Sequence, residues 1–271
     1  MPILGYGVYQ TPPDITEQCC LKAIEAGYRL IDTAQAYFNE EGVGRAIQNC
    51  GLPREELFIT SKIWISNGGY DKASASIKMS LDKLKSDYVD LMLIHQPYND
   101  YYGTYRALED ALSSGLVRAI GISNFYADRY LDLKEFSRIV PQVNQMETHV
   151  FNQQKELRSY LQEGNTALMA WGPFAEGRND FFNNEDLAMI GKAHGKSVAQ
   201  GALRFLIQNG IVAIPKSVHE ERMKENLEIF DFALSDEEMG RISALDTQTT
   251  AFFSHRDPEF MKWLFANRKI H

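Results

Sequence analysis

Four side chains in the first hundred residues could together move a proton onto a small molecule. Asp32 and Tyr37 stand in the stretch RLIDTAQAY, Lys62 lies near the end of LFITSKIW, and His95 follows the apolar run YVDLMLI. A tyrosine, with an ordinary pKa of about 10, is a weak proton donor at neutral pH, but an ammonium group beside its oxygen lowers that pKa. If Asp32 holds Lys62 in place and His95 binds the oxygen that Tyr37 protonates, the set suits the reduction of a carbonyl group.

Each of these residues also has a purely structural explanation. Asp32 could cap a helix, although the segment after it resembles a loop until about Glu40. A lone histidine such as His95 is more often a satisfied core residue than a catalytic one. Lys62 is harder to explain, because lysine is almost never buried without a partner and a buried ion pair adds little stability. A chemical role for Lys62 is therefore favoured.

The elements that must position these residues alternate along the whole chain. Short apolar or β-branched runs occur at 3–9, 29–34, 57–63, 88–96, 117–123, 142–148, 166–172 and 211–217. Between them lie helical patterns, for example Ile77, Leu81 and Leu84 at the spacing of one helix face. Eight repeats of strand and helix predict an α/β fold of the (β/α)8 TIM barrel type.

A doubly wound open sheet is the rival architecture. Gly5 and Gly7 begin a possible dinucleotide-binding fingerprint, and Asp32 follows at roughly the distance of the ribose-binding acid. Gln10 stands where the third glycine is needed, however, and Tyr9 is unsuited to a turn that touches a pyrophosphate. We expect instead that the two glycines allow a close approach of the first strand to its neighbours or to a ligand.

Polar or aromatic residues stand at the C-terminal end of seven of the eight runs. They are Asp32, Lys62, His95, Ser123 with Asn124, Gln145 with Glu147, Trp171, and Lys216 with Ser217. In a (β/α)8 barrel these ends lie on one face, on which active sites are built. The pattern therefore predicts one site formed by many strands.

Composition restricts the partners of the protein. The chain of 271 residues has a formal net charge of −8, which argues against a nucleic-acid or anionic-membrane surface. No stretch approaches the roughly 18 apolar residues of a membrane span, and the N-terminal residues do not resemble a signal peptide. Three cysteines without metal-ligand spacing favour a reduced compartment. We expect a cytoplasmic monomer without a metal site.

The motifs resemble those of the aldo-keto reductase family over essentially the whole chain. MPILGYGVY, IDTAQAYFNEEGVG, ITSKIW, LMLIHQP, GISNF, VNQMETH, AWGPF and IPKSVHEERMKEN occur in the family's order. The resemblance implies a single barrel domain over 1–271 that reduces small aldehydes or ketones to alcohols with NADPH. Within the family, the chain is similar to bacterial 2,5-diketogluconate and methylglyoxal reductases.

The resemblance also implies a role for each matching residue. Asp32, Tyr37, Lys62 and His95 form the catalytic tetrad, with Tyr37 as the proton donor and His95 orienting the carbonyl. The cofactor-binding residues are Ser123, Asn124, Gln145, Trp171, Gly172, Phe174, Lys216, Ser217, Val218, Arg222, Glu225 and Asn226. Lys216, Ser217 and Arg222 at a helix start suit a 2′-phosphate, so NADPH is preferred over NADH. Tyr9, Trp64 and His95 are expected to contact substrate.

Departures from the family pattern bear on the substrate. Gln96 stands where many relatives have tryptophan, so one wall of the pocket is more polar. The short C-terminal stretch AFFSHRDPEFMKWLFANRKIH predicts a compact pocket. Small aldehydes, ketoaldehydes such as methylglyoxal, and sugar-derived ketones all remain open.

Two other functions stay in view. The first is a cofactor-binding regulatory protein on the same barrel without significant turnover. The second is a barrel lyase or isomerase that uses Lys62 as a Schiff-base amine. Against the second, a carboxylate partner such as Asp32 predicts a charged and unreactive lysine.

Overall fold

The strands form one parallel sheet in which spatial order equals chain order. The computed structural model describes residues 1–267. The strands are β1 (Tyr6–Gly7), β2 (Leu30–Asp32), β3 (Phe58–Ile63), β4 (Leu91–Ile94), β5 (Ile120–Ser123), β6 (Val143–Glu147), β7 (Ala167–Trp171) and β8 (Val212–Ala213). Every strand lies inside one of the eight predicted runs. The predicted alternation is therefore confirmed.

The sheet closes on itself between its first and last strands. Leu4 bridges Ala213 in parallel, and the backbone N–H of Gly5 donates to the carbonyl of Ala213 at 2.8 Å. A Cβ added to Gly7 would lie 2.9 Å from the carbonyl oxygen of Ile214, so only glycine permits this approach. The sheet is a closed barrel, and the open doubly wound alternative is wrong.

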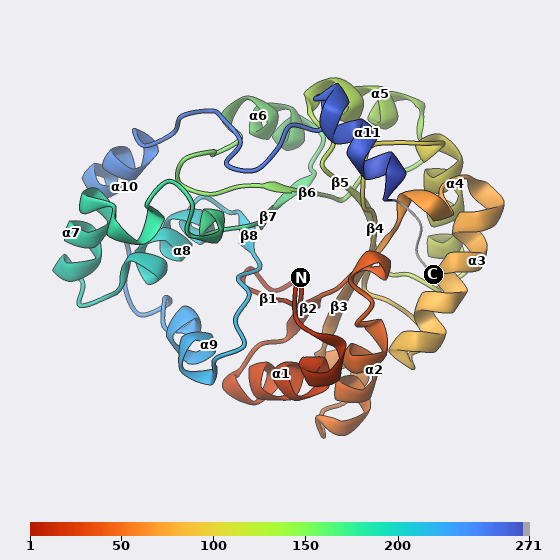
Figure 1. Cartoon of the computed structure of the whole chain (residues 1–271), viewed down its shortest axis with the longest axis horizontal. Coiled ribbons are helices and arrows are strands. Elements are labelled where there is room, and N and C mark those ends of the chain that lie inside the picture. Colours follow the sequence, from red (N-terminus) through yellow and green to blue (C-terminus); the bar gives the residue numbers. More distant parts are fainter. Residues whose placement is uncertain (268–271) are drawn as a thin grey trace.

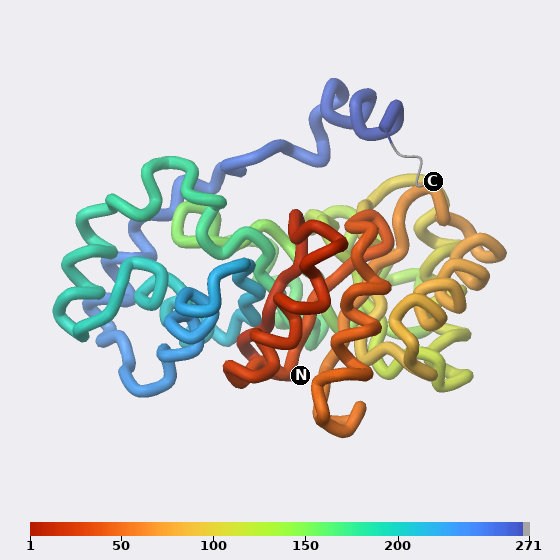
Figure 2. The backbone as a smooth tube through the Cα atoms, turned by 60° about the horizontal axis from the view of Figure 1, so that its bottom comes forward, coloured from red at the N-terminus to blue at the C-terminus, as the bar shows by residue number. Residues whose placement is uncertain are grey.

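Helices form a ring around the barrel, and the last described helix of the chain lies above it (Figure 1, Figure 2). They are α1 (Pro13–Ala26), α2 (Glu40–Asn49), α3 (Tyr70–Leu84), α4 (Tyr101–Ser113), α5 (Ala127–Phe136), α6 (Lys155–Glu163), α7 (Glu185–Ala193), α8 (Val198–Gln208), α9 (Glu220–Leu227), α10 (Asp236–Ser243) and α11 (Pro258–Ala266). Among the described residues, none of these helices has the length and apolarity of a membrane span.

The alternation of side chains along each strand decides which residues face the barrel interior. Leu91 and Leu93 of β4 belong to the interior cluster, whereas Met92 and Ile94 pack outward against the helices. By the same alternation Ile59 and Ile63 of β3 point outward, so Lys62 points inward. A lysine that faces the interior loses the solvation of its charge by water. It therefore needs a hydrogen-bonding partner inside the barrel.

The chain after α10 crosses the mouth of the barrel. We call residues 247–257 the C-terminal strap; α11 follows it. Glu147, at the end of β6, accepts hydrogen bonds from the Thr250 hydroxyl at 2.5 Å and from the Ala251 N–H at 2.7 Å. His149 donates to the same carboxylate at 3.0 Å, and these contacts hold the pKa of Glu147 below its usual range. Figure 2 shows the strap and α11 above the barrel. Residues 268–271 of the C-terminal stretch lie outside the described residues.

Close packing between α2 and α3 gives a test of the fold. A Cβ on Gly44 would lie 2.3 Å from the backbone oxygen of Lys83. We expect Gly44→Ala to lower the free energy of unfolding by about 2 kcal/mol through overpacking. Gly240→Ala in α10 meets nothing within 4 Å and should raise it by about 1 kcal/mol. Urea denaturation of the two variants measures both changes, and equal effects would contradict this account of the α2–α3 contact.

Candidate active site

Lys62 is completely buried, and its ammonium group has three hydrogen-bond acceptors. It donates to the carboxylate of Asp32 at 2.5 Å, to the carbonyl oxygen of Thr33 at 2.9 Å and to the hydroxyl oxygen of Tyr37 at 3.3 Å. Burial lowers the pKa of Lys62, and the neighbouring Asp32 opposes that effect. Because an ammonium group has three N–H donors, the three acceptors satisfy it completely. The predicted pair of Asp32 and Lys62 is present.

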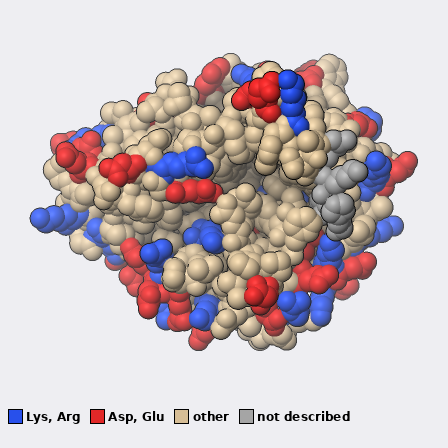
Figure 3. Space-filling model, viewed as in Figure 1, with Lys and Arg blue, Asp and Glu red and all other residues tan. Residues whose placement is uncertain are grey.

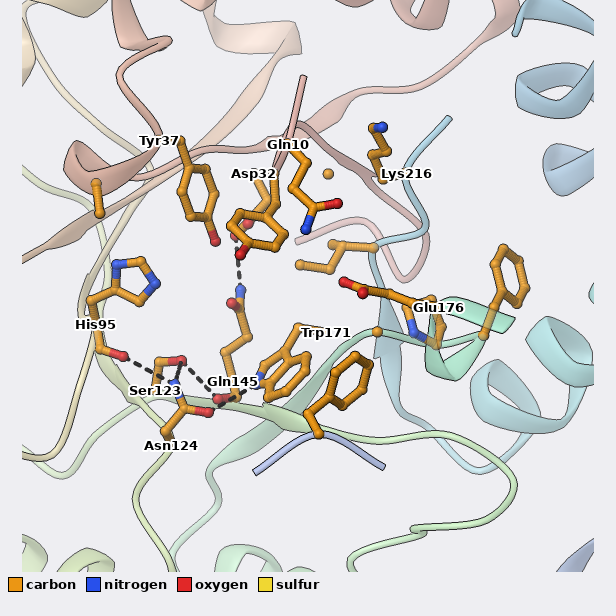
Figure 4. A pocket seen from close by; sticks show the side chains of 18 of the residues that line it. Gln10, Asp32, Tyr37, His95, Ser123, Asn124, Gln145, Trp171, Glu176 and Lys216 are labelled. Atoms are coloured by element: carbon orange, nitrogen blue, oxygen red, sulfur yellow. Dashed lines mark hydrogen bonds between the residues drawn. The ribbon is translucent and has the colours of Figure 1, made fainter. Parts of the chain in front are cut away.

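The chemistry of the two groups decides which of Lys62 and Tyr37 donates in the hydrogen bond between them. An ammonium group can only donate, so the Tyr37 oxygen accepts from Lys62. The phenol O–H is then available for a ligand. Figure 4 shows the Tyr37 oxygen pointing toward the middle of the pocket.

One sequence prediction about Tyr37 is wrong. The nearby ammonium was expected to lower its pKa, but the pKa of Tyr37 lies well above its ordinary value. Burial has the largest effect, and the Asp32 carboxylate and Tyr9 add to it. The sequence predicted the cation beside the phenol but not the extent to which packing around the phenol removes solvent, which disfavours a phenolate.

A short loop carries Tyr37 from the end of β2 to the start of α2. The buried Gln35 fixes it, because its side-chain oxygen accepts from the N–H of Trp64 at 3.0 Å and from the Asn67 amide at 2.8 Å. Its amide nitrogen donates to the Ser80 hydroxyl at 3.1 Å. As expected, Asp32 does not cap a helix. Gln35 itself was not predicted, since a loop glutamine has no distinctive sequence signal.

His95 lies at the end of β4 and borders the pocket beside Tyr37. The two rings meet edge to face with centroids 5.5 Å apart, and the Trp64 ring lies 5.0 Å from His95 on another side. Burial and the nearby Lys62 hold the pKa of His95 well below its usual range, so the ring is neutral at physiological pH. Its Nδ1 is buried and has no hydrogen-bond partner among the described residues. A neutral ring of this kind can still donate one hydrogen bond.

A second network of hydrogen bonds lies at the ends of β5, β6 and β7, and it is connected to the network around Lys62. The Gln145 amide donates to Asp32 at 2.8 Å, on the carboxylate oxygen that Lys62 does not use. The Asn124 amide donates to the Ser123 hydroxyl at 3.1 Å and accepts from the Trp171 ring N–H at 2.9 Å. Figure 4 shows these side chains around one cavity.

The cavity at the mouth of the barrel measures about 930 Å³. It lies on the hollowed face in Figure 3. The predicted site residues that line it are Tyr9, Asp32, Tyr37, Trp64, His95, Ser123, Asn124, Gln145, Trp171, Gly172, Phe174, Lys216, Ser217, Arg222, Glu225 and Asn226. Lys62 lies beneath the cavity, and Val218 packs partly buried against the core. The cavity is near the upper end of the range for small-molecule sites, and it includes the residues predicted to bind the cofactor. The compact substrate pocket stays a prediction.

One end of the cavity is suited to an anion. Lys216 and Arg222 border it with exposed side chains, and neither forms a salt bridge with another described residue. Ser217 is buried there, and its hydroxyl accepts from the N–H of His219 at 3.0 Å. Two cations without an internal partner are available for a charged ligand. No group of metal-binding side chains occurs in residues 1–267.

Part of the cavity wall was not predicted from the sequence. The strap and α11 contribute Phe252, Phe253, Phe260 and Trp263, and the segment after β7 contributes Arg178. Phe252 lies 5.2 Å from the Trp171 ring, and the guanidinium of Arg178 lies 4.8 Å from the Phe252 ring. Aromatic residues in a C-terminal segment are equally consistent with core packing, so their sequence pattern gave no specific signal.

Comparisons with known proteins agree with this geometry. A sequence profile described as the aldo/keto reductase family matches residues 4–247. A glyoxal reductase of Bacillus subtilis is 47% identical over 248 residues, which cover 91% of this chain and 89% of that protein.

Solved structures show the same fold. An aldo-keto reductase from a Medee basin deep-sea metagenome library has a TM-score of 0.93 and 41% identity, covering 95% of this chain and 96% of that one. A Bombyx mori aldo-keto reductase in complex with NADP has a TM-score of 0.89 and 34% identity, covering 97% and 93%. The family profile, the close relatives and the shared barrel show together that this chain belongs to the aldo/keto reductase family.

Proposed function

We propose that the protein reduces aldehydes or ketones to alcohols with NADPH, and that Tyr37 supplies the proton. The observation that carries this proposal is the one-way hydrogen bond from Lys62 to Tyr37, which leaves the phenol O–H available to the pocket. When bound, NADPH supplies the hydride. The chain's own residues bind the carbonyl, orient it and protonate its oxygen.

The raised pKa of Tyr37 is compatible with this role. A phenol whose pKa lies above its ordinary value is fully protonated at neutral pH, which is the form a proton donor needs. An oxygen that gains the negative charge of an alkoxide is a much stronger base than a phenolate, so proton transfer from Tyr37 is favourable. Lys62 stabilises the phenolate that remains, because its N–H already points at that oxygen.

His95 is proposed to orient the substrate carbonyl. Its ring is neutral and borders the pocket next to Tyr37. A neutral imidazole can donate to a carbonyl oxygen without competing with Tyr37 as an acid. Asp32 acts only through Lys62 and Gln145 in this scheme.

The residues around the cavity fit the proposed cofactor. The cavity has room for more than a small carbonyl compound, and the relative from Bombyx mori is in complex with NADP. Gly172 has a positive φ of 59°, and a Cβ there would lie 3.5 Å from the Phe252 ring. We propose that Ser123, Asn124, Gln145 and Trp171 hold the nicotinamide end. Lys216, Ser217 and Arg222 would hold the 2′-phosphate, and Glu225 and Asn226 are proposed to contact another part of the cofactor.

The two alternative functions have less support. A Schiff base requires an accessible amine, whereas the Lys62 side chain is fully buried and does not border the cavity. A regulatory protein without turnover has no need for a phenol O–H directed into the pocket.

We further propose that residues 1–271 act as one domain and as a cytoplasmic monomer. The chain's own strap completes the cavity, and the free cysteines suit a reducing compartment.

Removing the Tyr37 hydroxyl tests the proton donor. We expect Tyr37→Phe to lower kcat/KM for aldehydes by roughly 10²–10⁴, while the Kd for NADPH stays unchanged. Tyr70→Phe removes a phenol hydroxyl that pairs with Asp110 on the outer surface, so its activity should equal that of the parent. NADPH oxidation over a panel of aldehydes and NADPH fluorescence titration measure the two quantities. A Tyr37→Phe enzyme as fast as the parent would exclude Tyr37 as the donor.

The direction of the Tyr37 pKa predicts different pH profiles for the two reaction directions. Reduction needs the phenol, which stays protonated, so its kcat should be flat between about pH 6 and pH 9. Alcohol oxidation needs the phenolate, so its kcat should rise about tenfold per pH unit below the pKa. Steady-state rates in both directions check this. A loss of reduction near neutral pH would contradict the raised pKa.

Charge removal at the anion end tests the cofactor preference. Arg222→Ala should reduce the preference for NADPH over NADH about tenfold, because a charged hydrogen bond to phosphate is lost. Lys224 lies on the same helix but pairs with Glu220 and does not border the cavity. Lys224→Ala therefore serves as the matched control with an unchanged preference. The ratio of kcat/KM for the two cofactors is the measurement, and an equal ratio in all three enzymes would refute the phosphate site.

A further inference from the structure

Two buried tyrosines hold the part of the chain that carries Lys216 and Arg222. We call residues 216–227, which follow β8 and end with α9, the anion segment. The hydroxyl of Tyr6 donates to the carbonyl oxygen of Ser217 at 2.5 Å, and the hydroxyl of Tyr28 donates to that of Met223 at 3.1 Å. A carbonyl oxygen can only accept, so the phenols are the donors. One tyrosine therefore holds the start of the anion segment, and the other holds its helix.

Both phenols lie in the core between the barrel and its helices. Tyr6 and Tyr28 are each 1% exposed, and their ring centroids are 5.8 Å apart. Burial raises the pKa of both phenols, so their O–H groups stay protonated across the physiological range. Among the described residues, Tyr6 is the only hydrogen-bond donor to the carbonyl oxygen of Ser217. The loss of its hydroxyl would leave a buried acceptor without that donor, which is costly.

Tyr28 also contacts a residue that lines the cavity. Burial has the largest effect on the pKa of its phenol, and a hydrogen bond with the side chain of Asn226 opposes that effect. Asn226 is buried and borders the cavity. Tyr28 follows α1, which packs beside α9 (Figure 1). The beginning of the chain thus supports the anion segment from behind.

The position of this backbone decides how the two cations meet a ligand. Lys216 and Arg222 are exposed, so their reach depends on where the main chain places them. Tyr6 contacts the backbone one residue after Lys216, and Tyr28 contacts it one residue after Arg222. The hydroxyl of Ser217 lies on a short side chain and moves only with its backbone. Groups that are held in place in advance bind a ligand at a smaller cost in entropy.

We propose that Tyr6 and Tyr28 are positioning residues for the 2′-phosphate of the cofactor. Neither borders the cavity, and both act through the backbone carbonyls of Ser217 and Met223. Their hydroxyls strengthen the binding of the phosphate and leave the binding of the rest of the cofactor unaffected. The inference rests on the proposed function and names the residues that support its cofactor preference.

Removal of one hydroxyl at a time tests this role in the full-length protein. Tyr6→Phe and Tyr28→Phe should each lower the ratio of the NADH Kd to the NADPH Kd about fivefold, because a buried hydrogen bond to the anion segment is lost. The Kd for NADH should stay unchanged, since NADH has no 2′-phosphate. Fluorescence titration with each cofactor measures both constants without turnover.

Tyr130→Phe is the matched control. The Tyr130 phenol is also buried, and it donates to the Thr166 hydroxyl at 2.7 Å, because that hydroxyl donates in turn to the Pro141 carbonyl. Tyr130 does not border the cavity. All three variants lose one buried hydrogen bond, so each should lower Tm by about 2–4 °C. Only Tyr130→Phe should keep the parent's ratio of Kd values, which separates positioning from a general loss of stability.

The outcomes separate this inference from the proposed function. A parent-like ratio in Tyr6→Phe and Tyr28→Phe would overturn the inference and leave the reductase function standing. Equal weakening of NADPH and NADH would overturn it too, because the tyrosines would then support the cofactor site as a whole. Should Tyr6→Phe not fold, the ratio in Tyr28→Phe decides. If the parent binds both cofactors equally, the proposed phosphate site falls and this inference falls with it.

Discussion

A single buried ammonium group organises the candidate site at the mouth of this barrel. Alternation along β3 turns Lys62 inward, where water cannot solvate its charge. The group is tolerable only because Asp32, Thr33 and Tyr37 together accept all three of its hydrogens. Their placement compensates the buried charge, and the same contacts give the geometry that the proposed proton transfer requires.

Asp32 connects this arrangement to the rest of the site. One of its oxygens accepts from Lys62 and the other from Gln145, so it joins the side of the pocket around Tyr37 to the side around Trp171. Gln145 therefore already donates to Asp32 when no ligand is bound. The two sides of the pocket are therefore connected by two hydrogen bonds to one carboxylate.

The sequence was sufficient for the parts of the structure that depend on local pattern. Eight apolar runs predicted eight strands, and polar residues at their ends located the site, because the parallel strands of a barrel end on one face. The strap and α11 were not predicted as pocket walls, since nothing local shows what the rings of Phe253, Phe260 and Trp263 contact. The pKa shift of Tyr37 was predicted with the wrong sign, because burial, its largest cause, depends on how the folded chain packs around the phenol and not on the local sequence.

The strap, which hydrogen bonds fix to Glu147, is made after every strand of the barrel, and this order affects how the site is assembled. Residues 247–267 emerge from the ribosome after all eight strands, so a nascent chain can close its barrel and pair Lys62 before the wall bearing Trp263 exists. This part of the cavity wall is thus the last that synthesis adds. The same segment can diverge during evolution without disturbing the buried charge on which the barrel depends.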